Sequence, residues 1–165
     1  MRAAVKQFIE ETIDLIEENN WSDVAYKAES WNIDGRLQGA DLIEFWKIVR
    51  DDLKIDLFKF EDVEVVPTCY FYGSDIAAIE LPECIMHINK SAFTNCEKLE
   101  KLSLPNTIVS IGEGAFLNTD NLSEINYNGY KSDFKNIRLG YCAFGVNILG
   151  RNGKKLIAKD GVINL

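Results

Sequence analysis

The residue types that could perform nucleophilic or acid–base chemistry are few and isolated in this sequence. His87 is the only histidine, and no serine or cysteine nucleophile motif accompanies it. It stands between two apolar residues of a repeated segment, so we expect its side chain to point outward. The tripeptide Gly112–Gly114 is a lone G-x-G with no Lys-Ser or Lys-Thr after it, so it is not a phosphate-binding loop. We find no catalytic constellation and expect a protein that is not an enzyme.

The metal-ligating residue types also lack the spacing of a binding site. The cysteines are Cys69, Cys84, Cys96 and Cys142. No two of them form a C-x-x-C pair, so a zinc site is not expected. Asp51–Asp52 and the acidic cluster at 61–64 could attract a cation, but they lack calcium-loop spacing. The sequence thus predicts free thiols buried by packing, no metal and no cofactor.

The excess negative charge lies entirely in the first part of the chain. Residues 1–64 contain 16 Asp and Glu against 8 Lys and Arg, whereas residues 65–165 contain 10 of each. We name as the candidate partner-binding acidic surface Glu10, Glu11, Asp14, Glu17, Glu18, Asp51 and Asp52. Such a surface repels nucleic acid and anionic membranes and favours a basic partner. The alternative is a solvated helical face that only aids solubility.

Apolar residues recur at helical spacing within this acidic part. They are Val5, Phe8, Ile9, Ile13 and Ile16 in one segment and Leu42, Phe45, Trp46, Val49 and Leu53 in another. Between these segments, Ser22 is predicted to be the N-cap of a shorter helix, with Trp21 and Tyr26 forming a hydrophobic staple. Three helices with short connections predict a small bundle over residues 1–60. We expect the tryptophans to serve its packing and not to form a ligand cage.

A repeat with a period of 23 residues follows the predicted bundle. The segment 102–124, which begins "LSLPNTIVSIGEGAF", aligns with 79–101 without a gap. The paired apolar positions are Ile79 and Leu102, Leu81 and Leu104, Ile85 and Ile108, Ile88 and Ile111, Phe93 and Phe116, and Leu99 and Leu122. A fixed period in the twenties predicts a solenoid, in which stacked turns share one continuous core.

The repeated residues resemble the BspA-type leucine-rich repeat. Its pattern, roughly I-x-(I/L)-P-x-x-(I/V)-x-x-I-G-x-x-A-F-x-x-C-x-x-L, is present almost whole, with Gly112 at the glycine and Cys96 at the cysteine. The resemblance covers about Val65 to Ile137. The order of an acidic helical part before a few repeats is also similar to small proteins carried by phages and prophages of Gram-positive bacteria. This second resemblance implies a protein that binds and inhibits a host protein.

The C-terminal tail contains two turn signals between apolar runs, Asn152–Gly153 and Asp160–Gly161, which predict a β-hairpin. Such a hairpin would cap the open end of the solenoid. The expected fold class is therefore α+β: a helical bundle (1–60), leucine-rich repeats (61–137) and a C-terminal β cap (138–165). The segment "GYCAFG" at 140–145 is predicted to be a final degenerate turn.

Three functions remain open at the level of sequence. The favoured one is a non-enzymatic protein-interaction module with a host-encoded, basic protein partner, such as a nucleic-acid-handling protein whose DNA the acidic side chains would mimic. The second is a structural or adhesive role in a virion or at a cell surface, and the third is an enzyme without a visible site. No apolar run of about 18 residues exists, and acidic residues interrupt the place of a secretory signal, so we expect a cytoplasmic protein. Homodimers through a lateral edge are also compatible with the pattern.

Overall fold

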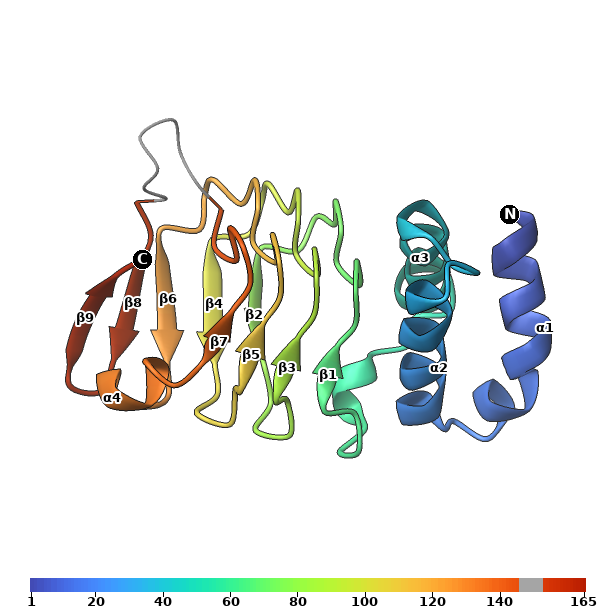
Figure 1. The fold of residues 1–165 in the computed structure, drawn as a ribbon, viewed down its shortest axis with the longest axis horizontal. Helices are drawn as coiled ribbons and strands as arrows, with labels where there is room; N and C mark the ends of the chain where they lie inside the picture. Colours follow the sequence, from blue (N-terminus) through green and yellow to red (C-terminus); the bar gives the residue numbers. More distant parts are fainter. Residues whose placement is uncertain (146–152) are drawn as a thin grey trace.

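Helices form one end of the molecule and two sheets form the rest (Figure 1). The structure is a computed structural model that describes residues 1–145 and 153–165. The expected mixture of helices and sheets is present, and the N-terminal helical part is confirmed. The predicted turn at Asn152–Gly153 lies partly outside the described residues.

The helical end is built around edge-on aromatic contacts. Its elements are α1 (Ala3–Glu17), α2 (Trp21–Ile33), α3 (Gly39–Lys47), the π-helical turn η1 (Ile48–Asp52) and the 3-10 turn η2 (Leu57–Lys59). The ring of Phe8 lies 5.1 Å from that of Trp31 and 4.9 Å from that of Phe45, both edge-on. Trp46 contacts Phe45 on one side and Tyr70 of the repeats on the other, with ring centroids 4.6 and 5.4 Å apart. One hydrophobic core therefore runs from the helices into the sheets.

The predicted helices need three corrections. The N-cap of α2 is Asn20, whose side chain accepts a hydrogen bond from Asp23 N, and not Ser22. Tyr26 is 77% exposed and forms no staple, because the helix starts at Trp21. Leu53 is exposed as well, since the π-type bond from Leu53 N to Ile48 O inserts a wider turn and rotates it off the apolar stripe.

The sheets are two ladders of short strands. The small sheet has the order β1 (Val65–Val66), β3 (His87–Ile88), β5 (Ser110–Ile111) and β7 (Arg138–Leu139). The large sheet has the order β2 (Ala78–Glu80), β4 (Lys101–Leu104), β6 (Glu124–Tyr127), β8 (Lys155–Ala158) and β9 (Gly161–Asn164). All neighbours are parallel except β8 and β9, which form an antiparallel hairpin at Asp160. A short helix, α4 (Lys131–Phe134), connects β6 to β7.

The register between strands is the one that the sequence period predicts. Ile79 pairs with Leu102, and Leu102 pairs with Ile125. The pairing extends past Ile137, because β7 joins β5 and Phe144 stacks on Phe116 with ring centroids 5.6 Å apart. The predicted degenerate turn at 140–145 is therefore present.

The interior between the sheets contains the predicted repeat core. Buried there are Leu81, Ile85, Ile88, Phe93, Leu99, Leu102, Leu104, Ile108, Ile111, Phe116 and Leu122. Ile79 is the exception: it is half-buried, because β2 is an edge strand with no neighbour on one side. Phe93 lies in the middle of a ladder, with ring centroids 4.9 Å from both Phe71 and Phe116 in stacked geometry.

Candidate interaction surface

His87 is placed beside a hydroxyl by the register of the small sheet. β3 pairs with β5 so that His87 lies opposite Ser110, and His87 Nδ1 is 2.8 Å from Ser110 Oγ. The ring is half-buried, so it is less outward than the sequence predicted. No carboxylate among the described residues hydrogen bonds to this ring. The contact links neighbouring turns and lacks the third group that would orient a catalytic histidine.

The cysteines are free and their chemistry is suppressed by burial where the packing is tight. Burial raises the pKa of the Cys69 thiol to about 11. Cys96 also has a raised pKa, chiefly from burial, and its Sγ donates to Phe71 O at 2.9 Å. Cys84 and Cys142 are only half-buried, so the prediction of buried thiols holds for two of the four positions. Within the described part of the chain, no group of three or more potential ligands could hold a metal ion.

The predicted acidic residues do not all lie on one surface. Glu10, Glu11, Asp14, Glu17 and Glu18 are exposed along α1, at the end of the molecule farthest from β9 (Figure 1). Asp51 belongs instead to η1, where Arg50 Nε and Nη2 donate to its carboxylate at 2.7 and 2.8 Å. This pairing holds the pKa of Asp51 below its usual value. Asp51 is therefore paired with its neighbour Arg50, while the other five residues face solvent along α1 and its C-cap, with Glu10 Oε1 3.7 Å from Lys6 Nζ.

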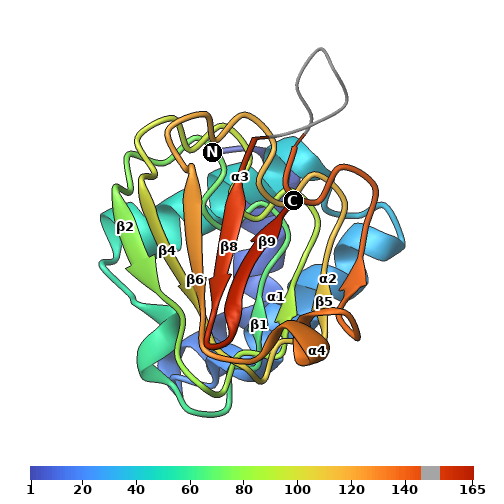
Figure 2. The same ribbon diagram turned by 90° about the vertical axis from the view of Figure 1, so that its left-hand side faces the viewer.

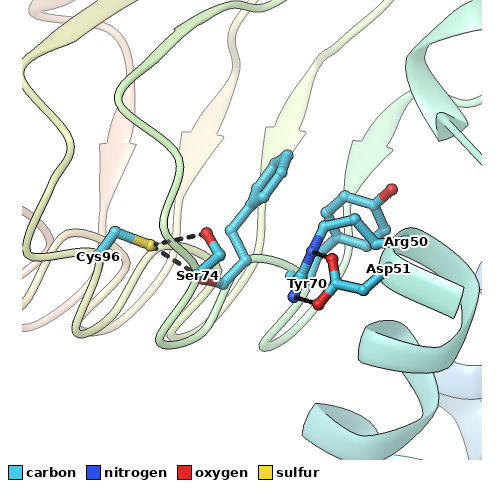
Figure 3. A network of polar contacts seen from close by, with 6 residues as sticks. Arg50, Asp51, Tyr70, Ser74 and Cys96 are labelled. Atoms are coloured by element: carbon cyan, nitrogen blue, oxygen red, sulfur yellow. Dashed lines mark hydrogen bonds and ion pairs between the residues drawn. The ribbon is translucent and has the colours of Figure 1, made fainter. Parts of the chain in front are cut away.

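Arg50 completes the hydrogen bonding of the first repeat turn. In later turns the carbonyls of Ala92, Ala115 and Ala143 each accept an N–H from the preceding turn. The equivalent carbonyl of Tyr70 has no preceding turn, and Arg50 Nη1 donates to it instead. Figure 3 shows Arg50 beside Tyr70, with its bonds to Asp51 as dashed lines. The same guanidinium lies 5.9 Å from the centre of the Phe71 ring.

A second contact joins α2 to the same turn. Glu29 accepts from Thr68 N at 2.6 Å and from Thr68 Oγ1 at 2.8 Å through its two carboxylate oxygens. Both oxygens thus satisfy groups at the exposed start of the stack. The helical end thus supplies side-chain partners to polar backbone groups of the first turn, at Tyr70 and at Thr68.

Polar side chains on the outer face of the large sheet lie in two rows set by the strand register. The first row is Ala78, Lys101, Glu124, Lys155 and Asn164; the second row is Glu80, Ser103, Asn126, Ile157 and Val162. Figure 2 shows these strands side by side, from β2 to β9. The first row alternates in charge across β4, β6 and β8. Parallel strands hold such side chains about 4.8 Å apart, so the rows form a mainly polar grid, in which Ala78, Ile157 and Val162 are the apolar members.

Two hollows lie in this outer face. One, of about 410 Å³, lies over the carboxyl ends of the strands and is lined by residues that include Glu80, Asn126 and Lys159. The other, of about 450 Å³, lies over their amino ends and includes Lys101 and Glu124. Asn126 lines both. The grid is therefore a contoured surface with a charged group at each hollow.

Polar side chains on other parts of the repeats hydrogen bond to one another. Asn95 Nδ2 donates to the Tyr72 hydroxyl and Asn118 Nδ2 donates to Asn95 Oδ1, both at 2.8 Å. Lys90 pairs with Glu113 at 3.2 Å. In contrast, no polar side chain of the two rows makes a hydrogen bond or ion pair with any described residue. The outer face of the large sheet thus has donors and acceptors that the fold does not use.

A stack of parallel turns of this length, with buried Leu, Ile and Phe at fixed positions, defines a leucine-rich repeat protein. The family model for the BspA type leucine-rich repeat region matches residues 54–145 in 6 copies, and the chain belongs to that family. A solved structure, the leucine-rich cell surface protein from Faecalibacterium prausnitzii A2-165, is 33% identical over 47% of this chain, with a TM-score of 0.46. The match covers 21% of that protein's length. No curated protein matches the chain. None of the helices that the structure describes is long and apolar enough to cross a membrane.

The sequence did not predict the contacts of Arg50 and Glu29 with the first repeat turn. It also did not predict which polar side chains of the repeats hydrogen bond to one another. Arg50 and Glu29 occur in ordinary amphipathic helices and carry no local signal for a distant carbonyl or amide. The grid could have been found, because its members occupy the outward positions beside the buried strand residues of each repeat.

Proposed function

We propose that this chain is a non-enzymatic protein-interaction module that binds a partner protein through the outer face of the large sheet. The observation that supports this proposal is the unused polar grid, in contrast to the paired polar side chains elsewhere on the repeats. The strand ladder already fixes the backbone that carries these side chains, so a partner has to order only the side-chain rotamers. BspA-type repeats are typically non-enzymatic, which agrees with this function.

The grid suits a partner whose surface carries both charges. Across β4, β6 and β8 the first row presents Lys101, Glu124 and Lys155 in register. A partner with an acidic, basic and acidic group at matching spacing would satisfy all three. Mismatched partners would leave these charges desolvated, which makes such a surface selective.

The proposal is tested by blocking the centre of the grid. The double variant Ser103→Arg, Asn126→Arg places bulky charges there. The control, Ser132→Arg, Asn136→Arg (the α4 variant), adds the same charges to exposed positions in α4 and just after it. Pull-down from the native host with mass spectrometry should identify proteins that bind wild type and the α4 variant but not the grid variant. If both variants retain the same proteins, the grid is not the binding surface.

The acidic face of α1 supports a second site, for a basic partner. Glu17 and Glu18 lie at the carboxyl end of the helix, where the helix dipole disfavours negative charge, and no basic residue occupies that last turn. Asp14 has a carboxylate one turn away on each side, at Glu10 and Glu18, which also destabilises an isolated helix. A charge pattern that opposes folding is explained if a basic partner neutralises it. We propose that this partner is a host protein that handles nucleic acid, and that the chain is a phage-encoded inhibitor of it.

Binding through α1 is tested by neutralising its five acidic residues to Gln and Asn. A basic partner should elute from wild type at moderate salt and should not be retained by the neutralised variant, because surface ion pairs are screened by salt. A partner that stays bound at moderate salt, and that also binds the neutralised variant, would contradict the proposal that α1 binds a basic partner.

The alternative is a structural or adhesive role in a virion or at a cell surface. It predicts that the chain is found in purified virions or on intact cells, whereas an inhibitor is found with its partner in the host cytoplasm. In either case we propose a solenoid over 61–137, with the bundle 1–60 at its start and the segment 138–165 as its C-terminal cap. We also propose self-association, through the surface described next.

A further inference from the structure

The last strand of the large sheet has an edge without a partner. The bond from Leu165 N to Lys154 O, together with the β8–β9 register, makes Leu156 and Ile163 a hydrogen-bonded pair. The N–H and C=O groups of the alternate residues, Val162 and Asn164, therefore point away from β8. These groups make no backbone hydrogen bond with any residue that the structure describes.

Only the Gly161 end of this edge is protected against pairing, by Lys131 of α4. Edge strands are commonly blocked by lysine, proline, a bulge or a covering segment. β9 contains none of the first two, and Val162 is 51% exposed. At the opposite edge of the sheet, β2 carries Glu80 and lies beside the helical end, whose Arg50 lines a hollow with it. Of the two edges of the large sheet, β9 is the one left uncharged.

We propose that β9 pairs antiparallel with β9 of a second copy of this chain. With a two-fold axis through Ile163, Val162 of each copy lies opposite Asn164 of the other. Each N–H then donates to the C=O of its opposite residue, so the edge groups of both strands are satisfied together. The contact is isologous, and it joins the two large sheets into one.

The charge distribution favours a second copy as the occupant. The excess charge of the chain lies in residues 1–64, and residues 65–165 are balanced. The acidic helices lie at the opposite end of the molecule from β9 (Figure 1). Two copies joined through β9 therefore keep their acidic ends apart, and no charged side chain of β9 faces its own symmetry mate.

Exposed apolar residues near this end of the molecule also favour a second copy as the occupant. Leu139 occupies the rung position of Ile111 and Ile88, which are each 1% exposed, yet it is 47% exposed because β7 is the last strand of the small sheet. Tyr141 in the next turn is 82% exposed. A second copy docked at this end would cover apolar surface beyond the strand itself. Since strand pairing of this length buries less than ~1,200 Å², we expect a weak, transient dimer.

Sedimentation velocity across a concentration series from ~10 µM to ~1 mM tests the proposal, because weak dimers populate only at high concentration. The average mass of wild type should rise from that of one 18.7 kDa chain toward twice that value. Val162→Pro removes an outward N–H without touching the β8 pairing, and Val162→Lys adds a charge near the axis; both should stay monomeric. Val162→Thr keeps the branched side chain and the N–H, and should dimerise like wild type.

Amide hydrogen exchange gives a second readout that needs no variant. The Val162 and Asn164 amides should become protected as the concentration rises, while exposed amides of α1 should not change. A wild-type mass that stays monomeric up to ~1 mM overturns the proposal, as does equal dimerisation of Val162→Pro. A monomer that instead binds an added strand peptide along β9 would also overturn it, since the occupant would then be a foreign strand.

Discussion

Replacing Arg50 by Met should destabilise the whole molecule, although Arg50 belongs to a helix and not to the repeats. Its guanidinium donates to the Tyr70 carbonyl, which otherwise has no partner at the start of the stack. Leaving a buried acceptor unsatisfied costs about 1–3 kcal/mol. Loss of the cation–π contact with Phe71 adds about 0.5–1 kcal/mol. We expect the free energy of unfolding to fall by about 1.5–4 kcal/mol, or roughly 3–16 °C in Tm for a chain of this size.

Urea denaturation at pH 7, followed by circular dichroism and tryptophan fluorescence, measures this loss. The matched control is Lys98→Met, which removes a cation from an exposed pair with Asp75 at 2.9 Å. Because exposed ion pairs contribute about 0–1 kcal/mol, the control should lose far less than Arg50→Met. If both variants lose equal stability, or if Arg50→Met stays within about 0.5 kcal/mol of wild type, Arg50 does not replace a missing turn.

Three further predictions concern the repeats. Phe93→Ala should cost about 3–5 kcal/mol, more than Phe144→Ala, because Phe93 stacks on two rings and Phe144 on one; urea midpoints of the two variants check this. Gly112→Ala should destabilise more than Gly39→Ala, since a Cβ at Gly112 would lie 2.6 Å from a backbone nitrogen while Gly39 has open space and no positive φ; similar Tm values would argue against close approach of the turns. Burial raises the pKa of Tyr70 from 10.0 to about 12, so the folded state keeps a proton that the unfolded state releases. Stability should therefore fall between pH 10 and about 12, by up to about 3 kcal/mol, and Tyr70→Phe should flatten that decline in pH-dependent unfolding.

The repeat was predictable because its positions are enforced locally and periodically. Leu102 must lie above Ile79 once successive turns have equal length, and Phe116 must then lie above Phe93. Burial of a fixed apolar set leaves one register, since a slip of one residue would turn that set toward water. The helical part was predictable for the same reason, from apolar spacing. Its boundaries were less so, because Asn20 and Ser22 are both good caps and local sequence does not choose between them.

The contacts at the ends of the stack depend on tertiary structure. Nothing around Arg50 or Glu29 indicates that one reaches the Tyr70 carbonyl and the other the Thr68 amide, across 20 and 39 residues of chain. Those partners are chosen by how the helices dock on the first turn. The same holds for Asp51, which the sequence grouped with the acidic residues of α1 and the structure pairs with Arg50.

The sequence by itself determined the period, the register, the core and the location of the negative charge. Tertiary structure alone decided which polar side chains are paired and which are not: His87 lies within hydrogen-bond distance of Ser110, whereas the Asn126 side chain makes no hydrogen bond with a described residue. The physical reason is the difference in how the two kinds of interaction are specified. Apolar periodicity acts through every turn of the chain, whereas a hydrogen bond requires two particular atoms within about 3 Å, and only the folded backbone brings them there.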